Sequence, residues 1–338
     1  MDLRKCIAGV VEPVLVRGKY VGIGVGVLQD GRKATFGFGR KSAGSKAPPD
    51  DDSLFEIGSI TKVFTATLLA CLKNEGLVSY EDPIRKHLPD GVKVASRNGK
   101  VIRLHHLATH TSGLPRLPDN LVLRDEENPY ADYRVEDLEK FMAKAKLGHD
   151  PGEAYEYSNV GGGLLGHLLA LRTGLSFGQA LASRICAPLE LNDTRVDLTD
   201  PQKGRLLAGH SPDGRKVPYW DIPTLSGAGA LRSSVNDQLR FLEANLGNAP
   251  EPLFSALSET HQARAQAGGG MKIGLGWHIS PMGTPDKSVL HWHNGGTGGF
   301  SSFAGFIKER RLGVVVLGNS AEQVDGLAHS ILIRLAGR

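Results

Sequence analysis

The sequence predicts an α/β protein of the α+β type, in which an antiparallel sheet has helices on its faces and a mostly helical lobe interrupts the chain. Strand-like segments occur near the start and again after residue 205, whereas residues 77–204 are helical and rich in loops. Turns rather than helical crossovers join neighbouring strand segments, which favours antiparallel pairing. We therefore predict a discontinuous sheet lobe (1–76 and 205–338) and a helical lobe (77–204) that form one unit, with the site in the cleft.

The composition is that of an ordinary folded protein: 338 residues, 40% hydrophobic and 22% charged. The net charge of +4 arises from 40 basic and 36 acidic residues that are interspersed, so neither a nucleic acid nor a membrane surface is implied as a partner. No apolar run is long enough to span a bilayer. The N-terminus lacks the apolar core of a signal peptide, which predicts a cytoplasmic protein as written, or a periplasmic or secreted one if a leader has been removed. Three widely spaced cysteines form neither a disulfide framework nor a zinc motif.

The first strands are predicted as a hairpin. Residues 7–17 look helical, and Val21–Arg40 then reads as two alternating runs around an Asp30-Gly31 turn. A dinucleotide-binding glycine loop is the alternative, but the segment turns into a second strand instead of opening a helix. Close packing against the strand is the favoured reason for its alternate glycines: Gly22, Gly24 and Gly26.

The first candidate for chemistry is Ser59-Ile60-Thr61-Lys62. A short apolar segment and Gly58 precede it, and the helix-like Val63–Leu72 follows. Ser59 is therefore expected in the first turn of a buried helix, where free N–H groups and the helix dipole favour negative charge. Lys62 lies one turn later on the same face and, if partly desolvated, can take the serine proton. The alternative is an N-cap serine followed by a solvated lysine.

Further along, His106 and His110 have the i, i+4 spacing of helical zinc ligands, but no glutamate lies between them and no third ligand is evident. A turn with hydrogen-bonded histidines is favoured. Residues 134–146 are predicted as an amphipathic helix.

Tyr157-Ser158-Asn159 then leads into a Gly/Leu-rich helix over residues 160–172. The next segment, residues 174–178, matches Gly-x-Ser-x-Gly, yet a nucleophile elbow needs a preceding strand. Gly174 as a helix C-cap and Ser176 as an N-cap are favoured instead.

The last third returns to strands. A Gly/Ser loop over Pro223–Ser234 and a helix over Val235–Leu246 come first, and residues 247–270 are predicted to be loop-like with a helical piece. The expected strands and final helix are Ile273–Ser280, Ser288–His293, Phe300–Lys308, Leu312–Gly318 and the helix Gln323–Leu335.

Three motifs now occur in order: Ser59-x-x-Lys62, Tyr157-Ser158-Asn159 and His293-Asn294-Gly295. Their order and spacing resemble the penicillin-recognising serine hydrolases, namely class C β-lactamases, low-molecular-mass D-alanyl-D-alanine carboxypeptidases and related esterases. Phe55–Lys62 and Leu107–Leu114 are similar to further signatures of that family, most of all to AmpH-type carboxypeptidase/endopeptidases. The resemblance covers about residues 20–335 and implies a β-lactamase/transpeptidase-like fold.

The resemblance also implies roles, which we state as expectations. Ser59 would be the nucleophile, Lys62 its base, and Tyr157 a phenolate or proton relay. Backbone N–H groups of Ser59 and Gly296 would form the oxyanion hole. The substrate-binding residues would be Asn159, His293, Asn294, Gly295 and Gly296. No metal and no cofactor are expected.

The third motif departs from the family pattern, because many β-lactamases have Lys-Thr-Gly where this chain has His293-Asn294-Gly295. A histidine is only partly charged near neutral pH, so it attracts a substrate carboxylate less than a lysine does. This favours a peptidase or esterase over an efficient β-lactamase. His291 shares a strand face with His293 as a metal pair would, but no further ligand is near in sequence.

The function expected is hydrolysis of an amide, β-lactam or D-alanyl peptide bond through an acyl-enzyme on Ser59. The alternatives are a carboxylesterase or acyltransferase on the same scaffold, and a non-catalytic penicillin-binding sensor or scaffold protein. The partner would be a small-molecule or peptide substrate. The loops 116–133 and 205–225 are expected to decide its identity, and the oligomeric state is left open.

Overall fold

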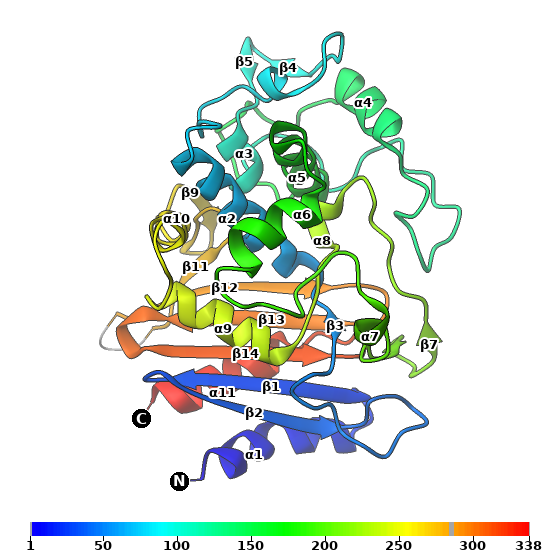
Figure 1. Ribbon diagram of the computed structural model, residues 1–338, viewed down its shortest axis with the longest axis vertical. Coiled ribbons are helices and arrows are strands. Elements are labelled where there is room, and N and C mark those ends of the chain that lie inside the picture. The colour runs from blue at the N-terminus through cyan, green and yellow to red at the C-terminus, as the bar shows by residue number, and fades with distance from the viewer. Residues whose placement is uncertain (1, 284–286, 338) are drawn as a thin grey trace.

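The computed structural model describes residues 2–283 and 287–337, and its centre is an eight-stranded antiparallel sheet in the order β2-β1-β14-β13-β12-β11-β10-β9 (Figure 1). All of its strands come from the two ends of the chain, as predicted. Their bounds are β1 Gly22–Gln29, β2 Arg32–Gly39, β9 Ala265–Gly268, β10 Met271–Ile273, β11 His278–Pro281, β12 Val289–Gly296, β13 Ser301–Ile307 and β14 Leu312–Gly318.

The β1–β2 hairpin confirms the turn prediction. Gln29 pairs with Arg32, so Asp30 and Gly31 are the two loop residues, and both have positive φ angles, 50° and 78°. Two successive positive φ values define the hairpin turn that follows the right-handed strand twist, and Asp-Gly adopts it at low cost.

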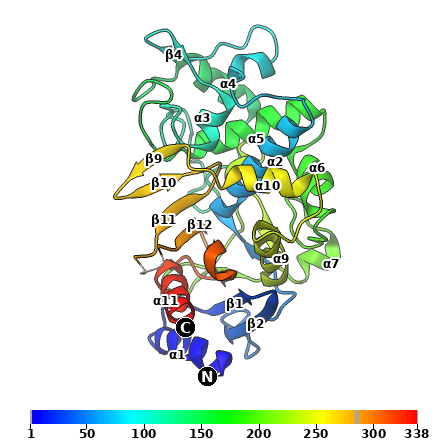
Figure 2. The same cartoon turned by 90° about the vertical axis from the view of Figure 1, so that its left-hand side faces the viewer.

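Helices cover both faces of the sheet (Figure 2). Each face has its own core, because side chains alternate along each strand. On β14, Val314 and Val316 join the core under α1 (Leu3–Val16) and α11 (Asp325–Ala336). The intervening Val315 and Leu317 join the larger core on the opposite face. Helix α9 (Val235–Asn245) covers that second face.

Gly24 and Gly26 lie where α9 crosses β1. A Cβ atom at either position would come within 2.8 Å and 2.7 Å, respectively, of the Val235 side chain. The prediction that these glycines permit close packing on the strand is therefore confirmed.

The remaining helices and short elements lie on the sheet's second face or in the lobe beyond it. They are β3 Phe55–Glu56, α2 Thr61–Asn74, β4 Ser96–Arg97, β5 Lys100–Val101, α3 Leu104–Ala108, α4 Val135–Lys144, α5 Asn159–Thr173, α6 Phe177–Leu181, α7 Asp200–Lys203, β6 Gly209–His210, β7 Lys216–Val217, α8 Ser226–Gly229, β8 Arg232–Ser233 and α10 Leu253–Thr260. Short 3-10 or π turns occur at Gly58–Ile60, Ile84–His87, Ala182–Cys186 and Lys308–Arg310.

Helix α2 connects the sheet with these helices through its contacts. Twelve of its fourteen residues are buried, and it packs against both α5 and α8. The glycines of α5 allow close contacts with both α2 and α8: a Cβ on Gly162 would lie 3.0 Å from the Lys62 side chain, and one on Gly166 would lie 2.7 Å from Gly227. The glycines in the Gly/Leu-rich helix α5 thus form a surface for close helix packing.

Three predictions of local structure were wrong. The single strand predicted over Ile273–Ser280 is two strands, β10 and β11, because Gly276 takes a positive φ of 77° and its N–H donates to the Ala108 carbonyl. The loop predicted over Pro223–Ser234 contains α8 and β8, and the loop-like 247–270 ends in β9. Helix α8 and strand β8 depend on partners distant in sequence, α5 and β3, whereas β9 pairs with the adjacent β10.

One continuous core runs from the second face of the sheet through α2 into the helical part. The division into lobes at residues 76/77 and 204/205 therefore stays a prediction. Within the described residues, no helix has both the length and the apolarity needed to cross a membrane.

Candidate active site

Ser59 lies in a 3-10 turn, Gly58–Ile60, that runs directly into α2. The preceding β3 pairs with β8, which sets the direction from which the chain enters the helix. Lys62, one turn further, is 3% exposed, and its Nζ lies 3.0 Å from Ser59 Oγ. The structure therefore brings together the two residues that the Ser-x-x-Lys motif predicted as a pair.

The surroundings of Lys62 decide how its amine can act. Its Nζ also lies 2.9 Å from Asn159 Oδ1 and 2.7 Å from the Ala228 carbonyl, and both of these atoms only accept hydrogen bonds. Burial, and secondly the charge of Arg116, hold the pKa of Lys62 well below its usual value. A neutral amine has two protons and one lone pair. With the protons given to the two carbonyl-type oxygens, the lone pair faces the Ser59 hydroxyl.

Tyr157 is brought to this pair by contacts between the turn after α3 and the segment before α5. The His110 carbonyl accepts from Glu156 N–H (2.8 Å), and His110 Nδ1 accepts from Ser158 N–H (3.1 Å). Ser158 Oγ donates to the Pro115 carbonyl (2.7 Å) and also accepts from Gly161 N–H, so Ser158, not Asn159, is the N-cap of α5. The Tyr-x-Asn motif is thereby held rigidly beside Lys62.

The Tyr157 ring lies between His110 and the Lys62 amine. Its centroid is 4.4 Å from that of His110 and 5.0 Å from Lys62 Nζ. Burial raises the pKa of the Tyr157 phenol, and a hydrogen bond with Ser59 acts in the opposite direction and does not offset it. The group is therefore a protonated phenol at neutral pH, which favours a proton relay over a phenolate.

The end of β12 lies against the Ser59 turn with almost no space between the two backbones. A Cβ on Gly295 would be 2.1 Å from the Ile57 carbonyl and 2.8 Å from Ser59 N, and one on Gly58 would be 2.7 Å from Gly296 N. Only glycines allow this approach, and Gly58 also needs its positive φ of 48°. The N–H groups of Ser59 and Gly296 are thus close neighbours, and both residues line the cleft.

His293 is the predicted site residue that the structure places differently. It points to the same face of β12 as Gly295, but Tyr157 and His278 cover it, and its exposure is 0%. Burial, followed by the neighbouring charges, holds the pKa of His293 well below its usual value. The expectation of a partly charged, substrate-facing histidine was therefore wrong: the imidazole is neutral and does not line the cleft.

The other predicted residues of this motif do line the cleft. Asn294 lies there with its amide donating to Asp325 Oδ1 (2.7 Å), and Gly295 and Gly296 complete the edge. Asn159 faces the cleft from the opposite wall.

The two motifs set aside as structural have structural roles. Gly174 ends α5 with a φ of 66°, and Ser176 caps α6 by accepting from Gln179 N–H. His106 Nδ1 accepts from Arg103 N–H, much as His110 accepts from Ser158. In the parts of the chain that the structure describes, no group of three His, Cys, Asp or Glu side chains could hold a metal ion.

The cleft has a volume of about 510 Å³ and contains side chains that the motifs did not reveal: Arg116, Tyr130, Tyr155, Trp220, His278 and Gln323. Arg116 comes two residues after the Leu107–Leu114 signature, and this proximity is the one sequence feature that could have identified it as a residue of the site. The others come from segments that only folding brings together.

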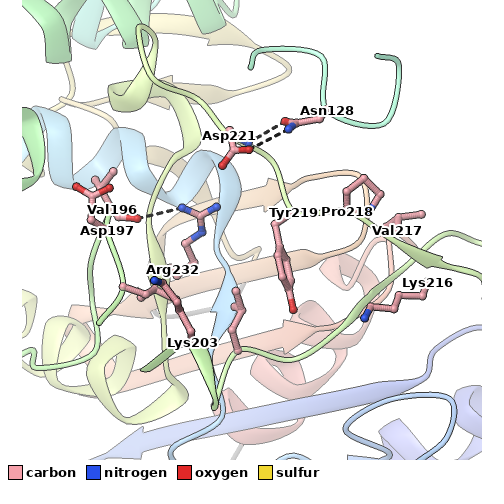
Figure 3. A pocket seen from close by; sticks show the side chains of 12 residues that line it. Asn128, Val196, Asp197, Lys203, Lys216, Val217, Pro218, Tyr219, Asp221 and Arg232 are labelled. Atoms are coloured by element: carbon pink, nitrogen blue, oxygen red, sulfur yellow. Dashed lines mark hydrogen bonds between the residues drawn. The ribbon is translucent and has the colours of Figure 1, made fainter. Parts of the chain in front are cut away.

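A larger cavity of about 930 Å³ lies on the other side of the segment around residues 218–221 (Figure 3). Tyr219 and Asp221 line it, whereas Trp220 lines the Ser59 cleft. Two hydrogen bonds join Asn128 to Asp221 across its rim. Among the residues that the structure describes, no serine, cysteine or histidine lines this cavity, so it offers no counterpart of the Ser59 nucleophile.

A hydroxyl, a desolvated amine and a phenol, beside two converging N–H groups, define a serine acyl-transfer site. Residues 3–338 match the protein family described as Beta-lactamase, so the chain belongs to the beta-lactamase family. It is 28% identical to a Beta-lactamase of Pseudomonas fluorescens, with 98% of each chain covered. It is 29% identical to the D-alanyl-D-alanine-carboxypeptidase/endopeptidase AmpH of Escherichia coli (strain K12), covering 86% of this chain and 77% of that protein.

The fold is shared with solved structures. A beta-lactamase/D-alanine carboxypeptidase from Pseudomonas syringae superposes with a TM-score of 0.87 at 25% identity and covers 99% of both chains. A class C beta lactamase from Rhodobacter sphaeroides gives a TM-score of 0.85 at 25% identity, with 98% of both chains covered. The β-lactamase/transpeptidase-like fold predicted for this sequence is confirmed.

The buried histidines predict a pH-dependent stability. Burial is the main cause that lowers the pKa of His261 to about 2, and of His278 and His291 to about 4. The folded protein keeps them neutral, whereas the unfolded chain takes up protons below about pH 6.5. The free energy of unfolding should thus be highest above pH 6.5 and fall as the pH drops toward 4, by about 1.4 kcal/mol per pH unit for each histidine.

Urea unfolding at pH 7.5, 6.0 and 5.0 measures this slope. His291→Phe is a matched variant, because His291 stacks on Phe306 at a centroid distance of 5.0 Å and phenylalanine can keep that contact. This variant should reduce the pH dependence of the free energy of unfolding by about 1.4 kcal/mol per pH unit, the contribution of one histidine. An unchanged slope would show that His291 does not stay neutral in the folded protein.

Proposed function

We propose that the protein is a serine hydrolase that cleaves a β-lactam or D-alanyl amide bond through a covalent acyl-enzyme on Ser59. The observation that carries this proposal is the buried Lys62 amine, which lies 3.0 Å from Ser59 Oγ and beside two carbonyl-type acceptors. When the amine is neutral, these acceptors take its two protons and leave the lone pair for the Ser59 hydroxyl. Membership of the beta-lactamase family supports the same chemistry.

In acylation, the Ser59 proton passes to Lys62 Nζ while Oγ forms a bond to the substrate carbonyl carbon. The carbonyl electron pair moves to its oxygen, which the N–H groups of Ser59 and Gly296 stabilise. When that pair returns, the carbon–nitrogen bond breaks. The Tyr157 phenol donates its proton to the leaving nitrogen and recovers one from the Lys62 ammonium, so that charge and protons balance.

In deacylation, water attacks the ester carbon and gives its proton to the same Tyr157–Lys62 pair. The ester bond to Oγ breaks and Ser59 regains its proton. Each step uses groups that already lie together in the structure.

The second candidate is a carboxylesterase or acyltransferase. The specific observation in its favour is that His293 is neutral and buried, so the third motif offers no cation for a substrate carboxylate. An ester without a carboxylate has no need of that cation, so a histidine in place of the family's lysine would not weaken its binding.

Covalent labelling tests the proposed function. We expect a fluorescent penicillin to add one acyl group to the protein, located by peptide mapping to the segment that contains Ser59, and Ser59→Ala to abolish it. Ser176→Ala is the matched control, since Ser176 is the other serine of a hydrolase-like motif and serves only as a helix cap. This control should keep the label while losing about 1 kcal/mol of stability.

An adduct on a different residue, or ester turnover that survives Ser59→Ala, would contradict Ser59 as the nucleophile. No adduct from any acylating reagent would instead support a non-catalytic sensor.

A further inference from the structure

The charge of the cleft is concentrated in one side chain. Of the residues that line it, Arg116 alone has a formal charge at neutral pH, since no aspartate, glutamate or lysine is among them. His278, also on the wall, is kept neutral by burial, which lowers its pKa to about 4. Within residues 2–283 and 287–337, the cleft is therefore a polar cavity with a single cation.

The backbone of Arg116 is fixed to the catalytic motif. Its carbonyl accepts from Asn159 N–H (2.9 Å) and from Val160 N–H (3.3 Å), at the start of α5. The side chain then extends over the Tyr157 ring, with the guanidinium carbon 5.2 Å from the ring centroid. Arg116 lines the same cleft as Ser59.

The Arg116 guanidinium is unpaired. No carboxylate of the described residues lies within salt-bridge distance of it, although the loop that follows contains acidic residues. Glu127, an acidic residue of that loop, pairs with Arg215 at 2.7 Å. An exposed arginine beside a nucleophile, with five N–H donors and no partner, is suited to a planar anion such as a carboxylate.

The opposite wall cannot serve this purpose. Asn294 gives its amide to Asp325, Ser301 Oγ donates to the Glu322 carbonyl, and His293 behind them is buried. None of these groups presents a positive charge to the cleft.

We propose that Arg116 is the anion-recognising residue of the cleft and selects substrates that carry a carboxylate near the scissile bond. This inference rests on the proposed acyl-enzyme function. Two sources of the carboxylate are chemically equivalent for a guanidinium: a carboxylate on the acyl part of the substrate, or the terminal carboxylate of a D-alanyl leaving group.

Arg116→Gln removes the charge and keeps a polar side chain, and Arg116→Lys keeps the charge without the planar fork. Arg124→Gln is the matched control, because Arg124 is an exposed arginine on the same loop that does not line the cleft. Each variant is compared on pairs of substrates that differ by one carboxylate. Carbenicillin and benzylpenicillin differ on the acyl side chain, and N-acetyl-D-alanyl-D-alanine and its C-terminal amide differ on the leaving group.

We expect Arg116→Gln to lower the ratio of kcat/KM, or of acylation rate, between the member with the additional carboxylate and the member without it by about tenfold to a hundredfold in one pair. Arg116→Lys should lose less, and Arg124→Gln should leave both ratios as in the wild type. Added salt should reduce the wild-type ratio, because a partly exposed ion pair is screened. The pair whose ratio falls identifies the source of the carboxylate.

Equal losses for both members of each pair leave the ratio unchanged; they would show that Arg116 only supports Tyr157 and would overturn the proposal. No loss for either member would overturn it as well. These outcomes differ from a failure of the proposed function, in which the wild-type protein itself forms no adduct with either penicillin and releases no D-alanine. That result would remove the basis of this inference as well.

Discussion

Replacing Lys62 with methionine is expected to slow acylation of Ser59 by about 10²- to 10⁴-fold, the range typical of a lost general base. Methionine fills nearly the same volume but has neither a lone pair to accept the serine proton nor a proton to return to Tyr157. Stopped-flow acylation by a chromogenic cephalosporin measures the rate. The protein should remain folded, with a free energy of unfolding within about 2 kcal/mol of the wild type, since the gain from removing a buried amine offsets part of the two lost hydrogen bonds.

Lys73→Met is the matched control, because Lys73 lies on the same helix but pairs with Glu259 at the surface. It should change the acylation rate little. An equal loss in both variants would show that α2 is merely disturbed.

The pH profile gives an independent readout for Lys62. A lysine with an ordinary pKa would make the acylation rate rise about tenfold for each pH unit between 7 and 9, as more of it became neutral. Because burial lowers the pKa of Lys62 well below that value, the wild-type rate should level off at a lower pH than it would with an ordinary lysine. A tenfold rise per unit across the whole range would contradict a lowered pKa of Lys62.

Gly295→Ala is expected to have the second large effect, on both activity and stability. The new Cβ would lie 2.1 Å from the Ile57 carbonyl and 2.8 Å from Ser59 N, both backbone atoms that cannot rotate away. The end of β12 must therefore separate from the Ser59 turn, which moves Gly296 N–H away from Ser59 N–H. We expect kcat to fall by about a hundredfold or more and the free energy of unfolding to fall by about 1–3 kcal/mol.

Steady-state kinetics and urea unfolding measure the two effects. Gly44→Ala is the control: it lies in a loop, its φ is not positive, and a Cβ there would meet no atom within 4 Å. Full activity in Gly295→Ala would mean that the two N–H groups do not need this contact to act together.

Local sequence signals were sufficient for the elements that depend on near neighbours. The Asp30-Gly31 hairpin, helix α2 after Ser59 and helix α9 were predicted within a few residues, because turn chemistry and helix periodicity operate over short ranges. The reversal at Gly276 was not predicted, because its N–H donates to the distant Ala108 carbonyl.

The site residues likewise divide into those that local sequence predicted and those that depend on distant contacts. Ser59 and Lys62 could be paired from their spacing alone, since one helical turn brings them together. Tyr157 and Asn159 required the family resemblance, and only the contacts of His110 and Pro115 with the start of α5 show why they reach Lys62. His293 was assigned to the correct motif, but it was expected to face the substrate and is instead buried.

The sequence by itself determined which groups can react: a serine one turn before a lysine, a tyrosine at the start of a helix, and glycines at the end of a strand. Tertiary structure decided their charges. Burial lowers the pKa of Lys62 well below its usual value, keeps Tyr157 protonated and turns His293 from a candidate cation into a neutral core residue. The reason is physical: the free energy of an ion depends on the water and the partners around it, which only the folded chain specifies. Sequence analysis assigned no role to Arg116. Among the described residues, it is the only permanently charged side chain that lines the cleft.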